Sequence, residues 1–78
     1  MTHETFKQKI YTPYVDAWKI IKLIQYADQT SDSDEQWQRY MKEIDRLRAT
    51  YPGNHFVEHL IRLLYDAGDV IKEENRKT

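Results

Sequence analysis

Cysteine is absent from the 78-residue sequence. Without a thiol, the chain cannot form a disulfide, use a thiolate nucleophile, or bind zinc or an iron–sulfur cluster through cysteine. A chain without cysteine also fits the reducing cytoplasm, which is where we expect this protein to be.

Long apolar runs and an excess of one charge are missing as well. The longest apolar stretch, IIKLI, is interrupted by Lys22, so we expect no segment that spans a membrane. The first eleven residues are polar and lack the apolar region of a signal peptide.

Twelve basic residues stand against 13 acidic ones, without a basic block. This balance disfavours a nucleic-acid partner, because such partners are bound largely through their phosphates.

Glycine and proline are scarce, with two residues of each, and they help to divide the chain into segments with helical periodicity. The predicted helices span residues 13–28, 33–51 and 54–74. Thr12 and Pro13 are typical of a helix start, and Asn54 is a good N-cap for the third helix. The second helix begins with SDEQ, which reads as a capping box led by Ser33.

The first twelve residues allow two interpretations. Thr12 is β-branched and precedes a proline, which favours a break and a short separate helix near residues 3–11, or an extension. Phe6 and Ile10 continue the apolar stripe of the first long helix backwards, which instead favours one long helix kinked at Pro13. We predict the short separate helix.

Each long helix carries an apolar stripe, and no segment alternates with the period of a strand. We therefore predict one all-α domain, an antiparallel three-helix bundle with a short additional N-terminal helix or extension. The predicted core consists of Trp18, Ile21, Ile24, Tyr40, Ile44, Leu47, Leu60, Leu64, Ala67 and Ile71.

The segment HFVEH matches the His-x-x-Glu-His motif of one class of zinc peptidases. On a helix, His55 and His59 would lie one turn apart as ligands, with Glu58 as the general base. A further acidic ligand is needed, and Glu73 and Glu74 lie too far along the same helix to supply it. We interpret the motif as the polar start of a helix, predict no metal, cofactor or catalytic residue, and retain a metal-dependent hydrolase as a remote alternative.

The junction YPGN raises the possibility of a helix-turn-helix DNA-binding unit. The third helix would then present Asn54, His55, Glu58 and His59 to the groove, with no basic residue before Arg62. We interpret the junction as the turn of an antiparallel helical hairpin. A nucleic-acid-binding regulator remains the alternative function.

The ten aromatic residues, six of them tyrosine, are the unusual part of the composition. When the three stripes face inward, the first and third helices retain a second set of apolar residues. The predicted interface consists of Val15, Lys19, Leu23, Tyr26, Ile61 and Tyr65. Phe6, Ile10 and Tyr11 could cover part of this surface within the chain, but apolar side chains with interleaved lysine are also typical of a protein interface.

We therefore predict a small non-catalytic protein–protein interaction module, such as a regulatory or adaptor protein. Its partner would be another protein or a second copy of itself in a homodimer, and we expect no membrane association.

Overall fold

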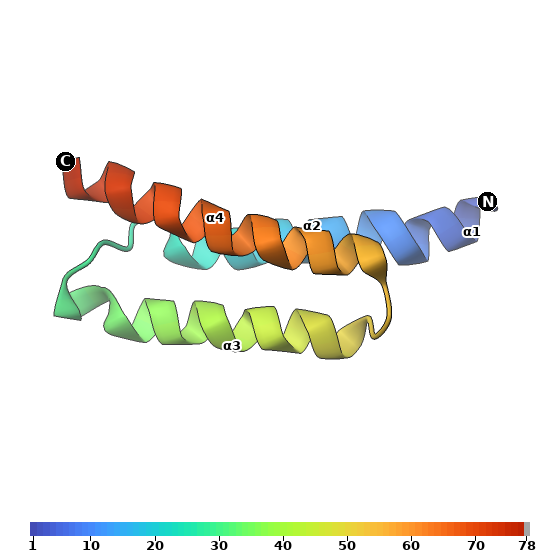
Figure 1. Ribbon diagram of the computed structural model, residues 1–78, viewed down its shortest axis with the longest axis horizontal. Helices are drawn as coiled ribbons and strands as arrows, with labels where there is room; N and C mark the ends of the chain where they lie inside the picture. Colours follow the sequence, from blue (N-terminus) through green and yellow to red (C-terminus); the bar gives the residue numbers. More distant parts are fainter. Residues whose placement is uncertain (78) are drawn as a thin grey trace.

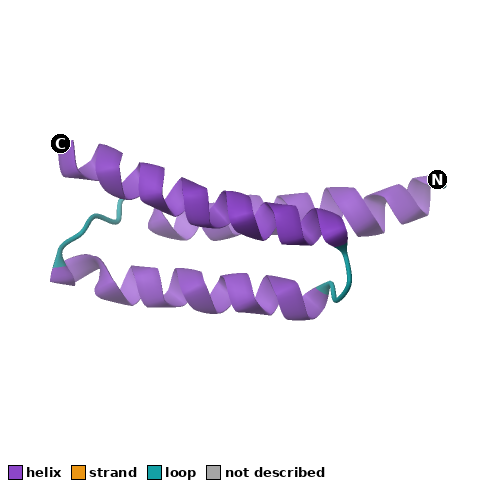
Figure 2. Cartoon of the chain, in the orientation of Figure 1, coloured by secondary structure: helices purple, strands orange, loops and turns teal. Residues whose placement is uncertain are grey.

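The computed structural model describes residues 1–77, which form helices joined by two loops, without a strand in that range (Figure 2). The elements are α1 (His3–Phe6), π-helical η1 (Lys7–Tyr11), α2 (Thr12–Ile21), the 3-10 turns η2 (Lys22–Ile24) and η3 (Ser31–Ser33), α3 (Asp34–Thr50) and α4 (His55–Lys77). Helices α2 and α4 run in the same direction and α3 runs against both (Figure 1). The predicted all-α antiparallel bundle is confirmed.

The N-terminal part differs from the predicted short separate helix. Elements α1, η1, α2 and η2 follow one another without a break, so residues 3–24 form one long helix. Thr12, where we predict a break, has helical angles of φ −62° and ψ −46°. The predicted break is therefore wrong, and the alternative of a single long helix through Pro13 is observed. Its first turns project past the loop between α3 and α4 (Figure 1).

A π-helical turn accommodates Pro13 within this helix. Proline has no N–H, and its ring clashes with the carbonyl four residues earlier, which is that of Lys9. The Thr12 N–H donates to the Lys7 carbonyl, five residues back, so this turn is wider than an α-helical one. The side-chain Nδ2 of Asn54 donates to the Lys9 carbonyl oxygen at 3.0 Å. The wider turn and the added donor allow the helix to continue through the proline.

Asp28 organises the loop between η2 and α3. Its Oδ1 accepts hydrogen bonds from the Thr30 N–H at 2.9 Å and from the hydroxyls of Thr30 and Ser33. These bonds, led by that of the Thr30 hydroxyl, lower the pKa of Asp28. Ser33 makes no capping bond to α3, and its Oγ instead accepts from the Asp28 N–H at 3.0 Å. The predicted capping box is therefore wrong, because Ser33 ends the 3-10 turn η3 and its side chain bonds to Asp28 in the loop instead of to α3.

The C-terminal end of α4 is longer than predicted and continues to Lys77. The Asn75 side-chain amide donates to the carbonyls of Gln25 at 3.1 Å and Ala27 at 2.5 Å, just beyond η2. We expect the tail ENRKT to fray, but its described part is helical and is held by these bonds. Thr78 lies outside the described residues.

Apolar side chains of the three long helices meet in one core. Its buried members are Ala17, Ile20, Ile24, Ala27, Tyr40, Ile44, Leu47, Val57, Leu60, Ile61 and Leu64. The predicted core residues of α3, Tyr40, Ile44 and Leu47, are confirmed, as are Ile24, Leu60 and Leu64. Ile21 and Ile71 are partly buried against this core, and Ala67 has intermediate exposure.

Trp18 is the clear error in the predicted core, because it is 55% exposed. The buried stripe of α2 consists of Pro13, Ala17 and Ile20, and Ile24 of η2 continues it. Trp18 follows Ala17 by one position, which turns it about 100° around the helix axis and away from the core.

Tyr40 joins α3 to α4 inside the core. Its hydroxyl donates to the Leu64 carbonyl at 2.5 Å, and its ring meets that of Trp37 edge-on at 6.0 Å between centroids. Lys72 of α4 lies over the Trp37 ring, with Nζ 4.5 Å from its centroid. Both aromatic rings lie beside Gly68, where an added Cβ would meet each at 3.6 Å. This face of α4 is therefore closed by α3.

Candidate interaction surfaces

The residues predicted to form an interface do not share one surface. Ile61 is 2% exposed and belongs to the core, so its assignment to the interface is wrong. It follows Val57 by one helical turn and precedes Leu64 by three residues, and both are buried. Tyr65 lies one helical turn before Gly68, which packs against Trp37 and Tyr40 of α3, so Tyr65 lies on the side of α4 that faces α3.

The other predicted interface residues lie along the helix formed by α2 and η2, or just beyond its end. Lys19 and Leu23 line a groove between α2 and α3. Tyr26, just beyond η2, is exposed, and Val15 has intermediate exposure. Since Tyr65 lies on the other side of α3, the predicted set is divided between two sides of the bundle.

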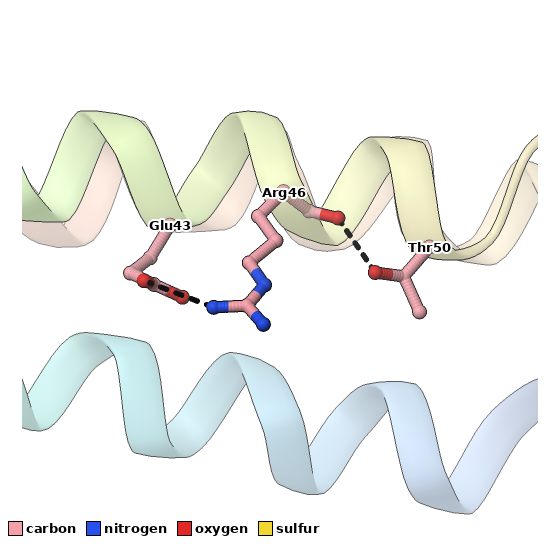
Figure 3. A network of polar contacts seen from close by, with 3 residues as sticks. All are labelled: Glu43, Arg46 and Thr50. Atoms are coloured by element: carbon pink, nitrogen blue, oxygen red, sulfur yellow. Dashed lines mark hydrogen bonds and ion pairs between the residues drawn. The ribbon is translucent and has the colours of Figure 1, made fainter.

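The groove between α2 and α3 has a volume of about 440 Å³. It is lined by apolar Ile20, Leu23 and Leu47 and by polar Asp16, Lys19, Arg39, Glu43, Arg46 and Thr50. Figure 3 shows Glu43, Arg46 and Thr50 on the side of α3 that faces α2. Arg46 Nη1 lies 3.8 Å from Glu43 Oε1, and the Thr50 hydroxyl donates to the Arg46 carbonyl at 2.8 Å. Charges of both signs thus meet within the groove.

Tyr51 follows the last residue of α3 and bonds to α2. Its hydroxyl donates to Asp16 Oδ2 at 2.7 Å and so links the end of α3 to α2. Burial, together with the hydrogen bond to the Asp16 carboxylate, raises the pKa of Tyr51 to about 12. Asp16 is therefore engaged within the chain.

The side of the bundle formed by α2 and α4 is the more apolar surface. Tyr11, Tyr14 and Trp18 recur at i, i+3 and i+7, which places them along one face of the long helix, and each is more than half exposed. On α4, Leu63 and Val70 are two helical turns apart and are both 60% exposed. We call these five residues the apolar face.

A shallow hollow joins the two halves of the apolar face. It has a volume of about 220 Å³ and is lined by Trp18, Ile21, Lys22 and Gln25 from the first long helix and its end, and by Ile71 from α4. Leu63, Val70 and Ile71 are spaced at i, i+7 and i+8, so the exposed side chains of α4 lie along the same side of the helix as Ile71. The face therefore crosses from one helix to the other.

Opposite charges border the apolar face beside Trp18 on α2 and beside Val70 on α4. Lys22 follows Trp18 by one turn, and its Nζ lies 5.9 Å from the centroid of the indole ring. On α4, Asp66 and Glu73 lie one turn to either side of Val70. Asp66 and Glu73 form no ion pair with other described residues. The α2 edge is thus basic beside Trp18, and the α4 edge is acidic beside Val70.

Sequence reasoning missed this face because it treated the apolar stripe of each helix as wholly buried. The spacing of Tyr11, Tyr14 and Trp18 is visible in the sequence and could have indicated a separate aromatic stripe. Either this aromatic stripe or the stripe that contains Ala17 could face the core. Which of the two is buried depends on which residues allow α3 and α4 to pack closely against α2.

The HFVEH segment forms the first turn of α4. His55, Glu58 and His59 are all exposed, and Glu58 Oε1 lies 3.4 Å from Arg48 Nε at the end of α3. Across residues 1–77, no group of three His, Cys, Asp or Glu side chains is arranged to hold a metal ion. The motif thus contributes an ion pair between two helices.

None of the helices in the described range combines the length and the apolar character needed to cross a bilayer. Comparison with protein families, curated proteins and solved structures gave no match.

Proposed function

We propose that this chain is a small non-catalytic protein–protein interaction module that binds its partner through the apolar face. The observation that carries this proposal is the exposure of Tyr11, Tyr14, Trp18, Leu63 and Val70, which helical spacing places on the sides of α2 and α4 beside their shared hollow. Large side chains gathered in this way are costly to leave in water and are typical of binding surfaces. The absence of cysteine is compatible with an adaptor or regulatory role in the cytoplasm.

The kinds of residue on this face support a binding role. Tryptophan and tyrosine are the side chains most often responsible for binding energy in interfaces. The hollow beside Trp18 provides a recess into which a partner's side chain could insert. The groove between α2 and α3 is a weaker candidate, because charges of both signs already meet inside it.

Site-specific photocrosslinking tests this proposal. A photoreactive phenylalanine analogue is placed at Trp18 or Tyr14, and in a control chain at Met41 of α3, which is 44% exposed. In extract from the organism that encodes the protein, we expect a discrete crosslinked product from positions 14 and 18 but not from position 41. Excess unlabelled wild-type protein should abolish this product, and excess Trp18→Glu protein should not. Equal crosslinking from all three positions, or none, would contradict the proposal.

A further inference from the structure

We infer that the apolar face binds a second copy of this chain, giving a dimer in which α2 of each protomer lies over α4 of the other. This inference rests on the proposed binding role of that face and names the partner. It follows from the charges at the two edges, the register of the helices and the size of the face.

The charges make the face complementary to itself. A two-fold axis parallel to the helices exchanges the two edges, so the basic α2 edge of one protomer meets the acidic α4 edge of the other. Lys22 would then face Asp66 and Glu73 of the other protomer. Because the symmetry repeats each contact, two such clusters flank the apolar centre, an arrangement that favours one register over others.

The hydrogen bonds between the two helices fix the height of each residue along the axis. Asn54 bonds to Lys9, a separation of 45 positions, and Asn75 bonds to Gln25, a separation of 50. These bonds align Lys22 with the stretch from Ala67 to Lys72, which lies between the two acidic residues of the α4 edge. A rotation about an axis parallel to the helices keeps these heights, so opposite charges meet without a shift along the axis.

The same alignment sets Trp18 level with the stretch from Leu63 to Gly68. In the dimer, the indole of one protomer would therefore lie against the exposed Leu63 of the other. Each protomer supplies one aromatic and one aliphatic anchor, and the pairing occurs twice. Contacts between large apolar side chains at the centre of an interface commonly dominate its binding energy.

The long face of the molecule is large enough for such a dimer. The chain measures 45 by 20 by 15 Å along its principal axes. A stable interface of standard size covers about 800 Å² on each partner, which is within the dimensions of the long face. No extra segment is needed to complete the contact.

Sedimentation equilibrium of the purified full chain, from 1 micromolar to 1 millimolar, tests the dimer. We expect wild type to dimerise and Trp18→Glu or Leu63→Glu to weaken the dimer at least about thirtyfold, the effect of losing a central anchor. Met41→Glu adds the same charge at an exposed site on α3 and should dimerise like wild type. Circular dichroism checks that all four chains remain helical. A wild-type chain that stays monomeric, or weakening by Met41→Glu equal to that by Trp18→Glu, would overturn the inference.

A charge exchange separates a specific interface from a general loss of apolar surface. One chain carries Lys22→Glu, and the other carries Asp66→Lys with Glu73→Lys. Each chain alone would bring like charges together twice, so we expect its dimer to be weakened. Mixed together, the two chains would again pair opposite charges at both edges, and a heterodimer should form more tightly than either homodimer. A mixture that pairs no better than its components would contradict the proposed arrangement.

These outcomes distinguish the dimer from the broader proposal. A monomeric wild-type chain that still gives competable crosslinks at Trp18 would refute self-association and leave the binding role of the face intact. A monomeric chain without such crosslinks would refute both.

Discussion

At the scale of single residues, tyrosines support the contacts between helices with their rings and their hydroxyls. Tyr40 is buried and donates to a backbone carbonyl of α4, and Tyr51 donates to the Asp16 carboxylate of α2. Burial raises the pKa of Tyr40 to about 12, and burial together with Asp16 raises that of Tyr51 to about 12. Both hydroxyls must keep their protons to make these bonds.

The raised pKa values predict a loss of stability in alkali. The usual tyrosine value is 10.0, so the unfolded chain releases these protons first as the pH rises. Stabilisation from neutral Tyr40 and Tyr51 is complete below pH 10 and is lost between pH 10 and about 12. We expect the free energy of unfolding, measured with urea at pH 8 to 12, to fall in that window. Tyr40→Phe should fall less steeply than wild type.

Tyr26→Phe is the matched control for this experiment, since Tyr26 is 81% exposed. It should show the same pH dependence as wild type. If Tyr40→Phe and Tyr26→Phe give identical slopes, the buried hydroxyl does not govern alkaline unfolding.

At the scale of elements, the long N-terminal helix depends on α4. Pro13 cannot donate to the Lys9 carbonyl, and Asn54 donates to it instead. The Oδ1 of the same side chain accepts from the Val57 N–H at 3.2 Å, which caps the start of α4. One residue thus starts one helix and supports the turn before a proline in another.

Substitutions of Asn54 can separate these two roles. Asn54→Ala removes the cap and the donor to Lys9, and we expect it to cost about 1–2 kcal/mol of unfolding free energy. Asn54→Asp retains an acceptor for Val57 and places a negative charge at the start of α4, where it is favoured. Chemical denaturation of both variants should therefore show Asn54→Asp as the more stable. Its amides at residues 7–12 should nevertheless exchange hydrogen faster than those of wild type.

A result in which the two variants lose equal stability would contradict this division, because the cap alone would then have no measurable value. Unchanged exchange at residues 7–12 in Asn54→Asp would show that the bond to Lys9 does not hold the N-terminal helix in place.

At the scale of the whole molecule, packing decides which apolar residues are inside. The interior of α2 is built from Pro13, Ala17 and Ile20, and that of α4 includes Ile61. Trp18 lies outside this interior, although the stripe of α2 to which it belongs is also apolar. The sequence predicted Trp18 inside and Ile61 outside, and the structure shows the reverse. These two positions therefore make the best test of this arrangement.

We expect effects of very different size on the free energy of unfolding at these two positions. Ile61→Ala should cost about 2–5 kcal/mol, because it removes buried methyl groups and leaves a cavity. Trp18→Glu should change the free energy of unfolding by less than about 1 kcal/mol at low protein concentration. It loses the contact with Lys22 but places Glu four residues before that lysine, a favourable helical pair. Urea denaturation measures both, and a larger loss for Trp18→Glu would contradict the assignment of the two faces.

Much of the architecture could be predicted from local signals. Short stretches of sequence are enough to predict the turn at Pro52 and Gly53, the N-cap at Asn54 and the apolar periodicity of α3. The positive φ of 73° at Gly53 is the left-handed conformation that glycine allows. Such features depend on local sterics and hydrogen bonds, so the helix order and the all-α class follow from the sequence.

Other features depend on residues far apart in the chain. The passage of the helix through Pro13 requires Asn54, and the helical tail is held by backbone carbonyls near Ala27. The identity of the buried stripe on α2 depends on how closely α3 and α4 can approach it. Helical period identifies apolar sides, but close packing between helices chooses among them. For this reason the sequence by itself determined the bundle, and only the tertiary structure decided that Trp18 and Leu63 belong to an open face.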